Sequence, residues 1–277
     1  SGTGCAAASL VGGHYWTPSS DADPWNSGTV WQSDGSGAAV GSFTLSSGYG
    51  YDGNDGHAVV VHDSNGARIG CGTLSEGRGG IHIHSGTSCA EASLVGGHYW
   101  TPPSATDPWT TTYGSGSESS SGSFTISSGY GVDGNLGHTV VLHAASNGAR
   151  IGCGVLYPAG TPLSASVGVY PGSSSVPPSG TVAVRSSGES HIAVEYEFAG
   201  VVPTLKTSMA AYPGSSGPGP TGDVAIEVRG AELTVVYKLA GLEPNAAGGL
   251  HIHSGTSCAE ASLVGGHYWT PSSDADP

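Results

Sequence analysis

Charged residues are scarce in this chain, and cations are the scarcest. Lys and Arg together number 7 against 21 Asp and Glu, charged residues make up 10% of the 277 residues, and the formal net charge is −14. Nucleic acids and anionic membrane surfaces attract proteins through clusters of positive charge. A sequence with so few cations and no basic cluster is therefore expected to bind neither.

Long apolar runs are also missing. The longest, such as the three valines at 59–61, have the length of a strand, whereas a membrane helix needs about 20 apolar residues. We therefore expect no membrane span. What the chain has instead is 48 Gly residues among many Ser, Thr, Val and Ala. This composition favours a β-rich, loop-rich protein, long enough for about two domains that each bury a core.

The chain repeats itself in two blocks. The first reads SGTGCAAASLVGGHYW at 1–16 and returns as SGTSCAEASLVGGHYW at 85–100 and at 254–269. The second block occupies 42–74, where it begins SFTLSSGYG and ends GARIGCGTL, and it returns in similar form at 123–156.

Two kinds of repeated unit follow from these blocks. The unit that carries both blocks, here called the C-half, occurs at about 1–75 and 80–156, and a third copy starts near 248. A different duplicated unit, the N-half, occurs at 164–200 and 206–241, and its two copies share YPGSS and a strand that reads GTVAVR in the first copy and GDVAIEVR in the second. The order along the chain is therefore C, C, N, N and the start of another C.

Turns rich in Gly, Pro and Ser divide each half into short strands. An N-half reads as three strands, which do not make a stable domain alone. A C-half adds about five, and an N-half plus a C-half therefore predicts an eight-stranded sandwich or flattened barrel. The expected C-half strands are the HIH strand and the segments Val30–Gln32, Ser42–Ser46, His57–His62 and Arg68–Leu74.

Histidines recur at positions that can converge. His82 and His84 stand two residues apart in the strand IHIH, so both imidazoles leave the same face. His98 follows in GGHYW, and His143 ends the strand HTVVLH. Four imidazoles from three distant segments suit copper or zinc. His57 and His138 lie at an odd offset from the strand-ending histidines and are expected to be structural or surface residues.

These motifs resemble the copper/zinc superoxide dismutase family. HIH, a Cys five residues later, GGH, GHxVVxH and GARIGCG are most similar to its copper-only, secreted, tandem-repeat branch. The resemblance implies an all-β fold of eight-stranded Greek-key sandwich or flattened-barrel modules in tandem, with one copper in each complete module. It implies the copper ligands His82, His84, His98 and His143, with His14 and His62 in the first copy and His251, His253 and His267 in the third.

The resemblance also implies catalytic roles. Arg150, and Arg68 in the first copy, match the arginine that holds the superoxide anion beside copper, although a lone surface Arg otherwise reads as a solvated turn residue. His98 and His14 match the histidine that leaves copper on reduction and takes a proton. No other His lies between His98 and His138, so the family's zinc ligands are missing and zinc is not expected. The short segment from His143 to Arg150 implies an open copper site.

Five cysteines fit the repeats with one left over. The family's disulfide ties the loop after the HIH strand to the last strand, which implies the pairs Cys5–Cys71 and Cys89–Cys153. Cys258 would then find its partner downstream. Paired cysteines indicate an oxidising compartment, so we expect an extracellular protein, secreted or at the cell surface.

The order of the halves predicts how the modules close. Residues 80–203 are expected to form one module in permuted order, from the C-half at 80–156 and the N-half at 164–200. Residues 1–79 would be completed by a preceding segment and residues 204–277 by a following one. Each chain would then be a link in a head-to-tail assembly, as part of a longer tandem array or as a strand-donating polymer.

Three functions remain open from the sequence. The first is superoxide dismutation at copper. The second is a structural role, in which the modules are building blocks of a secreted, O-glycosylated filament or surface array, as the abundant Ser and Thr and the low charge also allow. The third is copper capture or storage. Activity per bound copper, compared with free copper, separates the enzyme from the other two.

Overall fold

The structure is a computed structural model, and it describes residues 24–26, 28–101, 106–160, 162–174, 178–215 and 217–264. It is all-β, with 50% strand and 5% helix, which confirms the predicted class. None of the helices in these ranges is long and apolar enough to cross a membrane. The chain divides into two compact units: unit 1 combines Ser1–Glu76 with Thr204–Pro277, and unit 2 is Gly77–Pro203.

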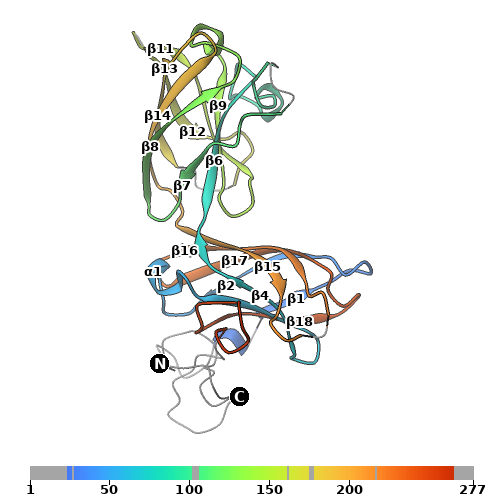
Figure 1. Cartoon of the computed structure of the whole chain (residues 1–277). Helices are drawn as coiled ribbons and strands as arrows, with labels where there is room; N and C mark the ends of the chain where they lie inside the picture. The colour runs from blue at the N-terminus through green and yellow to red at the C-terminus, as the bar shows by residue number, and fades with distance from the viewer. Residues whose placement is uncertain are drawn as a thin grey trace. The chain divides into compact units, whose positions relative to one another are not determined.

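Unit 2 is built from one continuous stretch of chain (Figure 1). Its antiparallel sheet has the order β7-β6-β9-β10-β12-β13-β14-β8, and β11 pairs with β12 beside this path. The end strands β7 and β8 lie close together, so the sheet is nearly closed. The bounds are β6 Arg78–His84, η3 Ala92–Leu94, β7 Thr112–Gly114, β8 Ser119–Ser127, η4 Asp133–Asn135, β9 Thr139–His143, β10 Arg150–Val155, β11 Tyr157–Pro158, β12 Leu163–Val169, β13 Ser179–Ser186 and β14 His191–Ala199.

Unit 1 repeats this pattern with strands from both ends of the chain. Its order is β1-β18-β3-β4-β15-β16-β17-β2, with β5 paired to β15 beside the path, and β1 and β2 lie close together. The bounds are η2 Pro24–Asn26, β1 Val30–Gln32, β2 Ala39–Ser46, α1 Tyr51–Asn54, β3 Ala58–His62, β4 Arg68–Thr73, β5 Ser75–Glu76, β15 Thr204–Ala211, β16 Thr221–Arg229, β17 Glu232–Ala240 and β18 Ala247–His253.

Most strands bury one face, as alternating sequences do. In β14, Ile192, Val194 and Phe198 are buried in the interior of unit 2, while Glu195 and Glu197 are exposed. The pairing of β14 with β13 and with β8 runs along its whole length, so this alternation fixes the register of the Ser-rich strand β8 as well.

Strand β9 is buried on both faces, and so is β3 in unit 1. In β9, Val140 and Leu142 belong to the main core, whereas Val141 packs on the other face with Val95 and the Cys153 side chain. The loop that carries the repeated SGTSC block therefore covers this second face. This cover positions the loop next to the histidines at the end of the strand.

The closure of unit 1 differs from the sequence-based expectation. Strand β2 pairs along its length with β17, β3 pairs with β18, and β4 pairs with β15. The C-half at 1–75 and the N-half at 206–241 therefore pair within one chain, and unit 2 lies between them in the sequence. We had expected preceding and following segments to complete them. The two halves share one core, in which Val59 and Val61 of the C-half are buried in the same cluster as Val224 and Ile226 of the N-half.

Candidate metal centre

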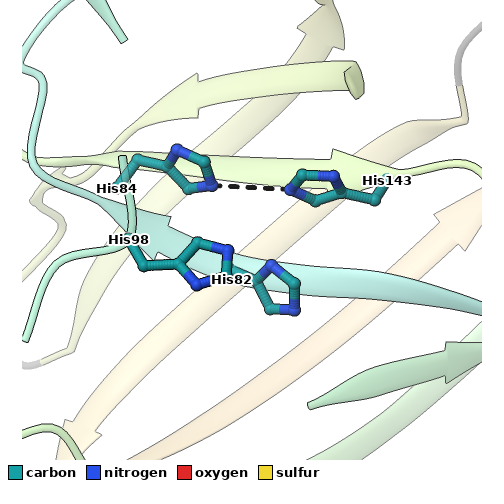
Figure 2. Close-up of side chains that lie close together, drawn as sticks. All are labelled: His82, His84, His98 and His143. Carbon is teal, nitrogen blue, oxygen red and sulfur yellow. Dashed lines mark hydrogen bonds between the residues drawn. The ribbon is translucent and has the colours of Figure 1, made fainter. Parts of the chain in front are cut away.

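Four imidazoles gather on two neighbouring strands of unit 2 and the loop that follows the first of them (Figure 2). His82 and His84 lie on β6, His143 ends the neighbouring strand β9, and His98 is held by a β-bridge to His84. One ring nitrogen of each lies within 4.8 Å of the other three. The four histidines that the sequence predicted as one ligand set are therefore brought together.

Backbone carbonyls fix the protonation of two of these rings. His84 Nδ1 lies 3.0 Å from the Gly96 carbonyl oxygen, and His143 Nδ1 lies 2.8 Å from that of Gly148. A carbonyl oxygen only accepts hydrogen bonds, so each Nδ1 must carry the proton. The Nε2 atom of each neutral ring then has a lone pair available for a cation.

These two Nε2 atoms face each other. They lie 3.5 Å apart and are joined by the dashed line in Figure 2. Because both rings already donate from Nδ1, neither neutral ring has a proton to place between the two nitrogens. Facing lone pairs repel, and a cation bound to both nitrogens would remove this repulsion.

Asp107 orients the third ring. His98 Nδ1 lies 2.6 Å from Asp107 Oδ2, and Asp107 Oδ1 accepts a 2.9 Å hydrogen bond from the Trp109 backbone N–H. Burial acts to raise the pKa of Asp107, but the hydrogen bonds from Trp109 and His98 outweigh it and lower the pKa. The carboxylate therefore accepts a hydrogen bond from the Nδ1–H of His98, and the Nε2 of His98 remains available to bind a metal.

Asp107 was not among the residues predicted from the sequence. It lies nine residues after His98 in a loop, where strand periodicity carries no information. The available signal was the tripeptide Asp-Pro-Trp, which occurs at 107–109 and again at 23–25.

His82 holds an unsatisfied buried nitrogen. Its Nδ1 is buried without a hydrogen-bond partner, while the ring has a backbone hydrogen bond to Thr111. An unsatisfied buried nitrogen is costly. A metal ion bound to this nitrogen would satisfy it, so the donor set of four imidazole nitrogens fits a metal of the copper or zinc class.

The rings are held in the form that binds metals. Burial, followed by the nearby His143, His98 and His84, lowers the pKa of His82 to about 3. Burial also lowers the pKa of His84 to about 4, assisted by Arg150, and lowers that of His143. These rings are therefore neutral near pH 7, and a cation does not have to displace a proton from them.

A glycine leaves room for this packing. A Cβ atom added at Gly80 would lie 2.8 Å from His82 Cε1 and 3.2 Å from His143 Cβ. At the matching position in unit 1, a Cβ at Gly249 would lie 2.7 Å from His251 Cε1. Both strands therefore need glycine two residues before their first histidine.

Unit 1 repeats most of this site. His62 at the end of β3 and His251 and His253 on β18 bring their ligand nitrogens within 4.8 Å of one another. His62 Nδ1 lies 2.9 Å from the Gly66 carbonyl oxygen, and its Nε2 lies 3.3 Å from His253 Nε2. The remaining predicted ligands, His14 and His267, lie outside the described residues.

The predicted arginines begin the strands that follow these histidines. Arg150 is paired across the sheet with His143, and Arg68 is paired with His62. The charge of Arg150 contributes to the lowered pKa of both His84 and His143. The Arg150 charge therefore acts on the cluster of unit 2, and Arg68 stands at the matching position in unit 1.

The histidines predicted to be structural lie outside both clusters. His138 stacks on Tyr99 with ring centroids 3.8 Å apart, and its Nδ1 lies 3.0 Å from the Ser85 carbonyl oxygen. His57 Nδ1 lies 3.3 Å from the carbonyl oxygen of His253. Within the described ranges, neither belongs to a group of potential metal ligands.

One disulfide agrees with the prediction and one corrects it. Cys89 pairs with Cys153 as expected, but Cys71 pairs with Cys258 instead of Cys5. Cys258 follows His253 by five residues, as Cys89 follows His84, and β18 beside β3 brings it to the same place. Cys258 is therefore not left over. Cys5 lies outside the described residues.

Comparison with protein-family models, with curated proteins and with solved structures finds no match. The metal and its chemistry must therefore be argued from the residues of the two clusters.

Proposed function

We propose that this chain is a copper-only, superoxide-dismutase-like protein in which each histidine cluster holds one copper ion. The observation that carries the proposal is the ligand set of unit 2. Two Nε2 lone pairs face each other, a third is freed by Asp107, and the buried Nδ1 of His82 is unsatisfied. Nitrogen ligands bind Cu²⁺ more tightly than the other divalent first-row metals.

The reaction follows from copper and a neighbouring cation. Bound copper supplies a one-electron couple, so that two superoxide anions and two protons give one O₂ and one H₂O₂. The guanidinium of Arg150, or of Arg68 in unit 1, attracts the anion to the cluster in a chain whose net charge of −14 would otherwise repel it. Asp107 holds the His98 ring in the orientation and tautomer that the metal needs.

Asp107 is also the reason why we propose no zinc beside the copper. A histidine that bridges two metals uses both ring nitrogens. His98 Nδ1 instead donates to Asp107, 2.6 Å away, so it has no lone pair for a second ion. The carboxylate thus occupies the side of the ring where a second metal would bind.

The fold and location belong to the same proposal. The nearly closed antiparallel sheets, with eight strands on each path, are what the Greek-key module implied by the motif resemblance would need. Two disulfides are compatible with an extracellular protein. We therefore assign the chain to an oxidising, extracellular setting.

The test is metal analysis followed by a dismutase assay on the full chain. The protein is reconstituted with copper and zinc together, dialysed and measured for both metals. We expect copper without equivalent zinc and a superoxide rate per bound copper well above that of free copper. A matched double variant, His84→Ala with His253→Ala, should lose copper and the rate together. Zinc at parity with copper, or activity no higher than free copper, would refute the proposal.

A structural role is the second candidate, and a duplication favours it. Residues 1–24 differ from residues 254–277 at only two positions, yet Cys71 forms a disulfide with only one of the two copies. A copy that can occupy the same place in another chain suits a building block of a secreted, O-glycosylated filament or surface array. Copper without turnover would favour this role, or copper storage, over catalysis.

A further inference from the structure

Both units contain the same contact between an arginine and a tyrosine. Arg150 Nη1 donates a 3.1 Å hydrogen bond to Tyr170 Oη, and Arg68 Nη1 donates a 3.0 Å hydrogen bond to Tyr212 Oη. The guanidinium carbons lie 5.8 and 5.7 Å from the centroids of these rings. Each tyrosine begins the YPGSS motif of an N-half, so an N-half residue contacts the arginine of a C-half site.

Each tyrosine hydroxyl also contacts a loop next to the disulfide. Tyr170 Oη donates to the Ala92 carbonyl oxygen at 3.4 Å, and Tyr212 Oη donates to that of Ala261 at 3.2 Å. Ala92 and Ala261 occupy the same position of the repeated block, three residues after Cys89 and Cys258. A phenol has one proton to donate and lone pairs to accept with, so one hydroxyl satisfies both partners.

The backbone of each tyrosine is fixed beside the arginine strand. The Tyr170 N–H donates to the Ile151 carbonyl oxygen at 2.9 Å, and the Tyr212 N–H donates to that of Ile69 at 3.0 Å. Ile151 and Ile69 directly follow Arg150 and Arg68. The Tyr170 side chain is only 7% exposed and packs with Val95, Val141 and the cysteines of the disulfide.

Holding the loop is not the whole role of the hydroxyl. Phenylalanine would fill the same apolar site, and the loop is already tied to its strand by Cys89–Cys153 or Cys71–Cys258. The hydroxyl's additional effect is to hold a guanidinium, in a chain with only 7 Lys and Arg, next to a histidine cluster.

We propose that Tyr170 and Tyr212 are positioning residues, which hold the Arg150 and Arg68 guanidinium groups beside the histidine clusters so that an entering anion meets their remaining N–H donors. This inference rests on the proposed function for its physiological anion, but its geometric content concerns any small anion at the metal site.

The principal test uses the double variant Tyr170→Phe with Tyr212→Phe in the full chain. Azide is titrated into the copper-loaded protein, and binding is followed by the visible absorption of Cu(II). We expect the dissociation constant for azide to rise about fivefold, the factor that corresponds to one hydrogen bond, and the superoxide rate to fall by a similar factor. Copper content should not change. Tyr157→Phe, at a side chain 62% exposed on β11, is the control.

A second measurement needs neither copper nor activity. In the metal-free protein labelled with ¹⁵N, the Nη–H groups of Arg150 and Arg68 should exchange with water more slowly in the native chain than in the double variant. The single variant Tyr170→Phe should affect the exchange of Arg150 alone. It is used in place of the double variant if the double variant does not fold.

The outcomes separate this inference from the proposed function. Unchanged azide affinity and unchanged Arg exchange in the phenylalanine variants would overturn the positioning role, even if thermal stability fell. If the native copper protein bound azide but did not dismutate superoxide, and the variants weakened azide binding, the dismutase proposal would fail while the positioning role would stand.

Discussion

At the scale of single residues, the first two ligands are readable from the sequence because their signal is local, whereas His98 and His143 were added from the repeats and the motif resemblance. Two histidines separated by one residue on a strand share a face, whatever the rest of the fold is. His82 and His84 were predictable on this ground. Asp107 was not, because its contact with His98 depends on the path of a loop. Supporting residues of this kind are recognised only when the structure shows what they contact.

Removal of the Asp107 carboxylate should weaken copper binding. In Asp107→Ala, His98 loses the acceptor that keeps its proton on Nδ1, so the Nε2 tautomer competes with the metal. Loss of such a supporting carboxylate typically reduces metal affinity by about 10- to 100-fold. Competition with a chelator of known affinity measures the change. Asp133→Asn, in the short helix η4, is the control, and equal affinities for the two variants would contradict the role given to Asp107.

Acid should destabilise the metal-free protein in a defined pH range. The pKa of His82 is lowered to about 3 and that of His84 to about 4, mainly by burial, whereas the unfolded chain binds protons near pH 6.5. The unfolded state therefore holds more protons below this pH. The contribution of these two histidines to the free energy of unfolding is therefore greatest above about pH 6.5, and it is lost as the pH is lowered toward 4 and 3.

Urea unfolding of the metal-free chain at pH 7.5, 5.5 and 4.5 measures this effect. The variant His191→Gln, which changes an exposed histidine on β14, should keep the same pH dependence. His82→Leu with His84→Leu should flatten it. A flat profile in the native chain would show that the buried histidines do not control acid stability.

At the scale of elements, alternation predicted the strands that have one exposed face. The predicted strand Val30–Gln32 has the same bounds as the observed strand β1, and each N-half forms three strands, as predicted. The two-residue strands β5 and β11 were missed because they are too short to alternate. The expected strand from His57 begins at Ala58 instead, because His57 lies where the chain enters the sheet.

Strand β6 also has little room for a side chain at Gly80, two residues before His82. In Gly80→Ala, the new Cβ would lie 2.8 Å from His82 Cε1, so the ring must move and copper affinity should fall. The crowding should also reduce stability by about 1–3 kcal/mol. In Gly168→Ala on β12, the new Cβ meets nothing within 4 Å, which makes this variant a matched control.

Copper titration and thermal unfolding of the two glycine variants test this prediction. Gly249→Ala should repeat the effect in unit 1, where the Cβ would lie 2.7 Å from His251 Cε1. If Gly80→Ala bound copper as tightly as Gly168→Ala, the close packing of His82 would not be needed for the site.

At the scale of the whole molecule, the sequence predicted that the C-half at 80–156 pairs with the N-half at 164–200, as their strands do in unit 2. It did not predict that the C-half at 1–75 pairs with the N-half at 206–241. Each C-half offers strands that match either N-half, and the three copies of the SGTxC segment are nearly identical. Pattern alone therefore cannot choose between closure within a chain and closure between neighbours. In the structure, the pairing of β2 with β17 and of β3 with β18 decides it for unit 1.

The duplicated segment makes a last prediction about this choice. Cys5 and Cys258 occupy the same position of the repeated block, and the copies differ only at Gly4 and Ala7, where residues 257 and 260 are Ser and Glu. Cys71 is buried in a cluster with Ala58, Val60 and Val264, and the first copy has Val11 at the position of Val264 in its sequence. In Cys258→Ser, we therefore expect Cys71 to form its disulfide with Cys5.

Non-reducing peptide mapping of Cys258→Ser identifies the new link, and electrophoresis without reductant shows whether it lies within or between chains. Cys89→Ser with Cys153→Ser is the control, which should leave Cys71–Cys258 intact. A Cys5–Cys71 link between chains would support head-to-tail assembly by segment exchange, and one within a chain would support a closed unit. A free Cys71 in the variant would show that residues 1–24 cannot replace residues 254–277, despite their near identity.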